Sequence, residues 1–128
     1  MKFSTKDFIL TAITLVVLDS IYLNIISSYF NQLITKVQGF PMKLEIQSAI
    51  LAYVVLVCGI YYLIIMQKRS IVDAMITGWL VYLTYELTNK AIIGKWEWKA
   101  VLIDGIWGGI LFGLTTYIVY TISKKIEE

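Results

Sequence analysis

The chain has 128 residues, of which 59% are hydrophobic and 16% are charged. A soluble domain of this size would expose too much apolar surface, so the composition indicates a protein that resides in a membrane. The net charge of +2 comes from scattered basic residues, which excludes the basic stripe of a nucleic-acid-binding protein. The absence of histidine excludes imidazole acid–base catalysis and most zinc or haem sites.

Four apolar stretches are long enough to cross a bilayer as helices, which takes about 20 mostly apolar residues each. We predict spans over residues 8–26, 46–66, 71–90 and 100–122. Helices are expected because hydrocarbon offers no partner for backbone polar groups, and the stretches are too long and uniform for barrel strands. The predicted fold class is an all-α, integral membrane four-helix bundle, with residues 1–128 as a single transmembrane domain.

The first span begins like a signal peptide, because an apolar run follows the basic residue Lys2. A cleavable signal peptide ends in a small-x-small motif. This run is instead followed by Asp19 and then by further apolar residues through Ile26. We therefore expect the span to be retained as a membrane helix.

The connection after the first span has a helical pattern of its own. Phe30, Leu33, Ile34 and Val37 follow the i, i+3, i+4, i+7 spacing of one helix face. This pattern predicts either a short interfacial helix or an extension of the first helix beyond the membrane. Residues 39–41, Gly-Phe-Pro, then turn the chain toward the second span.

The two remaining connections differ in length and chemistry. Residues 68–70, Lys-Arg-Ser, form the tightest break, so we predict an antiparallel hairpin of the second and third spans. Residues 94–99 alternate tryptophan with charged side chains, at Trp96 and Trp98. We interpret this connection as an interfacial aromatic anchor, and a lid over a pocket is the alternative.

The distribution of lysine and arginine predicts the orientation of the chain. The N-terminus, residues 68–69 and the C-terminus together carry slightly more basic residues than the first and third connections. The positive-inside rule then predicts a multi-pass membrane protein with both termini in the cytoplasm.

Three carboxylic acids, Asp19, Glu86 and Asp104, lie in or against the apolar stretches. A charged carboxylate at the centre of a bilayer costs about 2.5–3.5 kcal/mol on insertion scales. A chain tolerates such a residue if it faces the protein interior, has a partner or holds a proton. Counting residues along each span puts all three acids in the same half of the membrane, toward the first and third connections. We predict that they converge on one buried chamber.

Residues that share a helix face with the acids complete the predicted chamber. The candidate ligand-binding residues are Asp19, Tyr22, Tyr82, Tyr85, Glu86, Asn89, Asp104 and Trp107. The three acids are also the candidates for any catalytic role. No cofactor motif and no metal site beyond these acids is evident in the sequence, so neither group is expected. The alternative is a purely structural cluster in which Glu86 and Lys90, at i, i+4, neutralise each other.

Small residues recur every four positions in the fourth span, at Gly105, Gly109 and Gly113. Such a stripe lets helices approach closely. The partner helix is predicted to belong to the same chain, and a homodimer formed through these glycines is the alternative.

Four short patterns follow one another along the chain. They are Asp-x-x-aromatic-Leu at residues 19–23, Tyr-acid-Leu-Thr-Asn at 85–89, a tryptophan at 96 and Asp-x-x-Trp-Gly at 104–108. In this ordered set the chain resembles a family of small four-span membrane proteins of unknown function, known only as predicted membrane proteins. That family usually has Trp at the position of Tyr22 and Asp at that of Glu86, so the pocket size differs here. The resemblance implies an architecture and candidate residues, and no activity.

Three functional hypotheses follow from these residues. The acids, tyrosines and tryptophan on three helices favour binding or modification of a lipid or another membrane-dissolved small molecule. A proton-coupled small transporter is the first alternative, because acids within spans can carry protons. A structural or accessory subunit without a ligand is the second, because buried polar groups also hold membrane helices together.

Overall fold

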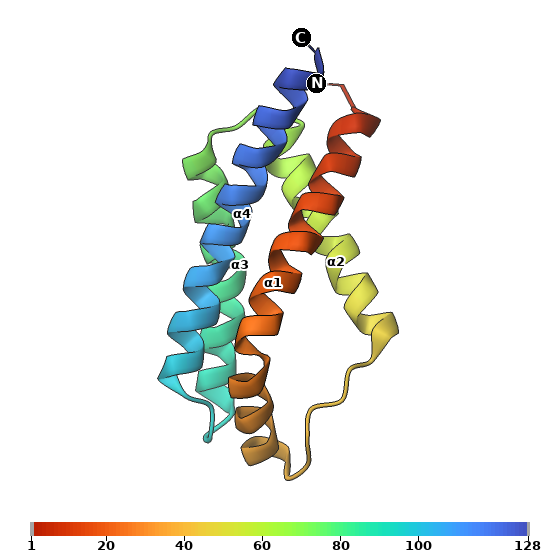
Figure 1. The fold of residues 1–128 in the computed structure, drawn as a ribbon. Coiled ribbons are helices and arrows are strands. Elements are labelled where there is room, and N and C mark those ends of the chain that lie inside the picture. Colours follow the sequence, from red (N-terminus) through yellow and green to blue (C-terminus); the bar gives the residue numbers. More distant parts are fainter. Residues whose placement is uncertain (1, 128) are drawn as a thin grey trace.

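The computed structural model describes residues 2–127, which form four long helices. The helices are α1 (Thr5–Gln38), α2 (Ile46–Ile60) with its π-helical continuation η1 (Tyr61–Ile65), α3 (Ile71–Ile92) and α4 (Trp98–Glu127) (Figure 1). The described residues contain no strand. The all-α helical bundle predicted from the sequence is confirmed.

Three helices in the described part of the chain are long and apolar enough to cross a membrane, namely α1, α2 together with η1, and α4. The remaining predicted span, residues 71–90, corresponds to α3, which is more polar and is not among them. However, α3 has 22 residues, or about 33 Å at 1.5 Å per residue, and its most extensive packing is against α4. Packing on α4 therefore compensates for the weaker apolar character of α3.

The two ends of the bundle are built differently (Figure 1). Both termini and the α2–α3 connection meet at one end, here named the closed end. Residues 39–45 and 93–97 form the connections at the opposite end, here named the open end. The two ends of the chain therefore lie at the same end of the bundle (Figure 1), while the choice of the cytoplasmic side stays a prediction.

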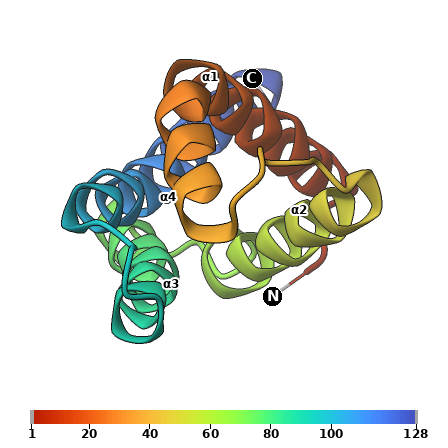
Figure 2. The same ribbon diagram turned by 90° about the horizontal axis from the view of Figure 1, so that it is seen from below.

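The second and third spans do not pack as the predicted hairpin. Their connection is tight, and Ser70 caps the start of α3 by accepting a hydrogen bond from the Asp73 amide. Beyond it, α2 makes little contact with α3 and diverges from the other helices toward the open end (Figures 1 and 2). The prediction was wrong because α3 packs on α4 instead, and α2 is left without a partner on that side.

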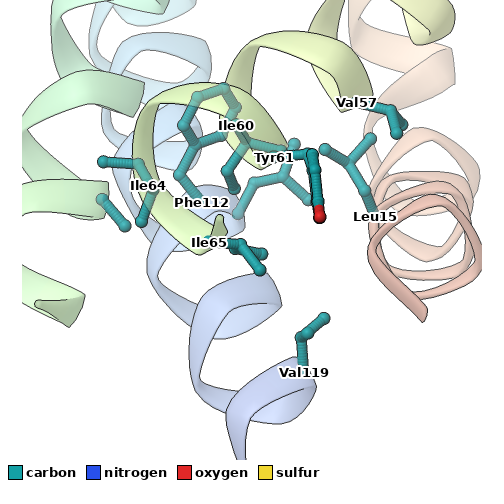
Figure 3. Packing of buried hydrophobic residues seen from close by; sticks show 10 residues of the cluster. Leu15, Val57, Ile60, Tyr61, Ile64, Ile65, Phe112 and Val119 are labelled. Carbon is teal, nitrogen blue, oxygen red and sulfur yellow. The ribbon is translucent and has the colours of Figure 1, made fainter. Parts of the chain in front are cut away.

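Buried apolar side chains fill the half of the bundle nearer the closed end (Figure 3). They include Leu15, Val57, Ile60, Tyr61, Ile64, Ile65, Phe112 and Val119. Polar contacts then fix this end: the Tyr120 hydroxyl donates to the Arg69 carbonyl oxygen at 2.7 Å, and the Ser123 hydroxyl donates to Asp7 Oδ1 at 2.7 Å. The termini are thereby joined to the helix connection.

The apolar pattern after the first span is an extension of α1. This helix has 34 residues, or about 51 Å, which exceeds the roughly 30 Å hydrocarbon thickness. Leu33 is 2% exposed and packs with Trp96, Ala100 and Val101 at the start of α4. Gly39 ends the helix with φ of 88°, a left-handed conformation that glycine adopts without strain. The predicted separate interfacial helix is not formed.

The glycine stripe of α4 is covered by α3 of the same chain. A Cβ atom at Gly105 would collide with Leu83, at Gly109 with Trp79 and at Gly113 with Met75. A second chain would have to displace α3 to reach these glycines, so the stripe serves packing within the chain. The homodimer considered through Gly105, Gly109 and Gly113 has no free surface there.

The closest approach of α3 and α4 gives the first testable prediction. A Cβ atom at Gly78 would collide with the backbone of Gly108, which has no flexible side chain that could move away. Gly78→Ala is therefore expected to lower the free energy of unfolding by about 1–3 kcal/mol, the usual effect of overpacking. Unfolding of the protein in mixed micelles with increasing sodium dodecyl sulfate measures this change.

Gly59→Ala is the matched control, because nothing lies within 4 Å of a Cβ placed at Gly59. This variant should unfold at or above the detergent fraction of the wild type, since alanine favours the helix. Equal stability of Gly78→Ala and Gly59→Ala would contradict the packing described for α3 and α4.

Candidate ligand-binding site

Asp19 is held by donors from two other helices. The side chain projects from α1 and the residue is only 8% exposed. The Tyr53 hydroxyl of α2 donates to Oδ2 at 2.6 Å, and the Trp107 indole N–H of α4 donates to Oδ1 at 3.0 Å. Both carboxyl oxygens therefore have a donor, and one side chain ties three helices together.

Asp104 of α4 is reached through the same aromatic residues. The Tyr22 hydroxyl of α1 donates to Asp104 Oδ1 at 3.0 Å. The Tyr22 ring stacks on the Trp107 ring with centroids 4.6 Å apart and an interplanar angle of 6°. The stacked pair thus links the two aspartates, because Trp107 donates to one and Tyr22 to the other.

Glu86 of α3 is the most deeply buried of the three acids, at 1% exposure. The Trp96 indole N–H donates to Glu86 Oε1 at 2.8 Å. The Glu86 carboxyl lies beside that of Asp104, and the two side chains line one cavity. The structure therefore brings all three acids into one connected cluster, here named the acid–aromatic cluster (Asp19, Tyr22, Tyr53, Glu86, Trp96, Asp104 and Trp107).

Trp96 is not the interfacial anchor that the sequence favoured. It is 6% exposed and packs against Leu33. Its indole N–H donates to the buried Glu86 carboxyl, which holds the ring inside the protein. Trp98 is 61% exposed and fits the anchor role, with the Lys90 ammonium 5.6 Å from its ring centroid. The mutual neutralisation of Glu86 and Lys90 is not formed, since the two side chains have these other partners.

Two cavities adjoin the cluster. The larger, of about 550 Å³, lies between α2 and α3, and its walls include Leu51, Val55 and Val81. The smaller, of about 390 Å³, lies between α1, α3 and the open end. It is lined by Tyr22, Leu23, Ile26, Ser27, Phe30, Ile34, Met42, Leu44, Tyr85, Glu86, Trp96 and Asp104. Tyr85 and Asp104 line both cavities, so the two spaces meet at these side chains.

The predicted site residues fall into three groups. Those that line at least one cavity are Tyr22, Tyr82, Tyr85, Glu86 and Asp104. Asp19 and Trp107 belong to the hydrogen-bond network and line neither cavity. Asn89 lines neither cavity and is not part of the network, because its side chain makes no hydrogen bond within residues 2–127. Three residues beyond Glu86, it points about 60° away from that side chain around the helix.

Sequence reasoning missed one member of the cluster and misjudged another. Tyr53 was not among the predicted residues, although its hydroxyl stands in the most apolar span and needs a partner there. A tyrosine hydroxyl within an otherwise apolar span was therefore the sequence signal that could have identified Tyr53 as a partner of a buried acid. Trp96 was identified only through the family resemblance, because the alternation of tryptophan and charge is equally typical of a membrane interface.

Charged groups at the open end form a rim outside the cluster. Lys36 Nζ lies 2.6 Å from Glu97 Oε2, and the Tyr29 hydroxyl donates to Glu97 Oε1 at 2.6 Å. The Lys36 ammonium, followed by the Tyr29 hydroxyl, holds the pKa of the Glu97 carboxyl below its usual value of 4.5. Lys99 Nζ lies 4.8 Å from the Tyr29 ring centroid. The rim joins α1 to the chain that precedes α4.

The cluster offers the chemistry of carboxyl groups. Such groups accept hydrogen bonds, share a proton or neutralise a cation. Within residues 2–127, no group of three or more His, Cys, Asp or Glu side chains is arranged to hold a metal ion.

Comparison with known families gave one finding. The family model described as "Predicted membrane protein (DUF2177)" matches residues 4–122, a range that contains the whole acid–aromatic cluster and both cavities. Neither the curated proteins nor the solved structures gave a match.

The contacts of Asp19 predict a loss of stability when its carboxyl is removed. Asp19→Ala leaves the Tyr53 hydroxyl and the Trp107 N–H without their acceptor, which costs about 1–3 kcal/mol for a buried donor. Asp19→Asn keeps one acceptor oxygen and should lose less. Unfolding in mixed micelles measures both, with Asn24→Ala as the exposed control on the same helix. If Asp19→Ala is as stable as the wild type, Asp19 does not hold the helices together.

The rim predicts a pH-dependent contribution to stability. The folded-state pKa of Glu97 is lowered, so its stabilisation is present above the unfolded pKa of 4.5 and is lost as the pH falls through the lowered folded value. The thermal midpoint of wild type should therefore exceed that of Glu97→Gln at about pH 7, and the difference should shrink as the pH falls below about 4.5. Glu45→Gln at the start of α2 is the control, since Glu45 meets only a serine hydroxyl. A pH-independent difference would contradict this.

Proposed function

The chain belongs to the DUF2177 family of predicted membrane proteins, and we propose that it binds a lipid or another membrane-dissolved amphiphile beside its acid–aromatic cluster. An amphiphile has an apolar chain and a polar end, and a matching site needs one long apolar wall that ends at polar groups. Both parts are present in the adjoining cavities.

The larger cavity carries this proposal. Its walls between α2 and α3 are almost entirely apolar, and Asp104 supplies a carboxyl group among them. Its volume of about 550 Å³ lies within the range of known ligand pockets, about 300–1,000 Å³. The cavity is lined by residues of α2 and α3, which diverge here, so we expect it to open between these two helices toward the acyl chains that surround a membrane protein.

The three acids have different surroundings, which supports different roles. Asp19 has a donor on each oxygen and lines neither cavity, so its role is to hold the helices. Glu86 and Asp104 each receive one donor from an aromatic side chain and both line a cavity. A purely structural cluster would have no reason to leave two acids beside open space. The polar end of the ligand therefore belongs next to Glu86 and Asp104.

Proton-coupled transport is the second candidate function, and one observation favours it. The Glu86 and Asp104 carboxyls line the same cavity, and a proton bound to either acid would compete with a ligand that binds the pair. Binding alone explains both cavities without a further step, so we place it first. A pH gradient across proteoliposomes that drives no uptake of the bound compound would remove the transport candidate.

Filling the larger cavity tests the proposed function. Ala52→Trp places an indole within the cavity, whereas Ala91→Trp places one on an exposed part of α3 that lines neither cavity. Lipid that remains bound to the protein after purification in detergent is measured by native mass spectrometry. We expect wild type and Ala91→Trp to retain the same amphiphile and Ala52→Trp to retain at least about tenfold less.

Equal retention in Ala52→Trp would contradict binding in this cavity. Purified wild-type protein that carries no amphiphile and takes none up from added lipid would contradict the function as a whole. Thermal midpoints of both variants, measured in the same detergent, show that each protein is folded when it is compared.

A further inference from the structure

We propose that the polar end of the bound amphiphile is an ammonium group, held by Asp104 and Glu86 where the two cavities meet. This inference rests on the proposed function and specifies its ligand. It follows from three independent features of the site: the charge of the cluster, the unused acceptor atoms and the aromatic walls.

The acid–aromatic cluster contains three acids and no cation. Each hydrogen-bond donor to these acids within residues 2–127 is a neutral tyrosine hydroxyl or tryptophan N–H. Four lysines of the open end have other partners: Lys36 pairs with Glu97, Lys95 donates to the Lys36 carbonyl oxygen, and Lys90 and Lys99 lie over aromatic rings. The exposed Lys43 of the 39–45 connection donates to none of the three acids in the described residues. No cation within the cluster balances the charge of an ionised carboxyl group there. A positive ligand therefore complements it, and an anionic one is repelled.

The acceptor atoms point to a ligand that donates hydrogen bonds. Asp104 uses Oδ1 for Tyr22, and Glu86 uses Oε1 for Trp96. In the described part of the chain, no tyrosine, tryptophan or lysine side chain donates to the other oxygen of either acid. A carboxylate offers about four lone-pair sites, so both residues keep acceptor capacity toward the cavities they line. An ammonium group carries several N–H donors and a positive charge, whereas an alcohol offers a single neutral donor.

Aromatic side chains form the walls around these acceptors. Tyr22, Tyr85 and Trp96 line the smaller cavity together with Glu86 and Asp104. The faces of aromatic rings attract cations, most strongly where water is excluded. Carboxyl groups within aromatic walls are thus the surroundings that an organic cation requires.

The apolar part of the ligand has a defined place. The larger cavity extends from Asp104 along Leu51, Val55 and Val81, and these side chains suit an alkyl chain. With the ammonium at Asp104, the chain leaves between α2 and α3 into the surrounding lipid. Two sources supply this chemistry: a free long-chain amine, or a lipid whose head group carries an amine.

Competition among matched ligands tests the inference. Radiolabelled dodecylamine is bound to the full-length protein in neutral non-ionic micelles at about pH 7, where the amine is positively charged. Unlabelled dodecylamine, dodecanol and dodecanoic acid then compete for the site. We expect the amine to compete at least about tenfold more strongly than the alcohol, and the acid to be the weakest. If phosphatidylethanolamine competes with dodecylamine and phosphatidylglycerol does not, the natural ligand is an aminolipid. If neither phospholipid competes, the natural ligand is a free amine.

Variants separate the head-group contact from the cavity itself. Asp104→Asn should reduce the preference for amine over alcohol to about one, while dodecanol binding is retained. Asp104→Glu should restore part of the preference, and Asp73→Asn at the start of α3 should leave it unchanged. Where Asp104→Asn has a lowered thermal midpoint, Glu86→Gln provides the same comparison, because it also keeps the size of the side chain.

The outcomes distinguish the two proposals. Equal competition by amine and alcohol in wild type, or an unchanged preference in both Asp104→Asn and Glu86→Gln, overturns the ammonium assignment and leaves the amphiphile site intact. If none of the three compounds binds specifically, and Ala52→Trp changes nothing, the proposed function itself fails.

Discussion

A carboxyl group is stable inside an apolar bundle only when it has hydrogen-bond donors, and here aromatic side chains from other helices supply them. Tyr53 and Trp107 serve Asp19, Tyr22 serves Asp104, and Trp96 serves Glu86. Each donor also brings a ring whose apolar surface suits the interior. The acids thereby act as junctions between helices, and the positions of α1, α2 and α4 relative to one another depend on Asp19.

The site lies where tight packing of α3 on α4 gives way to loose packing between α2 and α3. Glycines on both helices bring α3 close to α4, whereas α2 has no such partner and diverges from α3. At the closed end, the core around Tyr61 and the contacts of Tyr120 hold α2 in place. A helix that is fixed at one end and free at the other leaves a wedge-shaped space. The larger cavity lies in that space, and Asp104 is one of its few polar walls.

The three acids divide the work between architecture and binding according to their surroundings. A carboxyl with a donor on each oxygen has little left to offer a ligand, which is the situation of Asp19. Glu86 and Asp104 each receive one aromatic donor and keep unused acceptor capacity beside open space. The rim of Lys36, Glu97 and Tyr29 encloses the open end without neutralising these acids. The cluster thus combines rigidity on one side with an unfilled acceptor surface on the other.

The sequence by itself predicted the helices and most of the candidate site, while it left open whether the apolar pattern of residues 30–37 extends α1 or forms a separate helix. Apolar periodicity reveals which face of a helix is buried, and residue counting gives depth, so Asp19, Tyr22, Glu86 and Asp104 could be grouped from the chain alone. Neither signal identifies the neighbour on the buried face. Tertiary structure alone therefore decided that Tyr53 serves Asp19, that Trp96 turns inward to Glu86, that Asn89 is left out and that the α4 glycines meet α3. These choices depend on contacts between residues far apart in sequence, where a few ångströms of helix displacement select one partner over another.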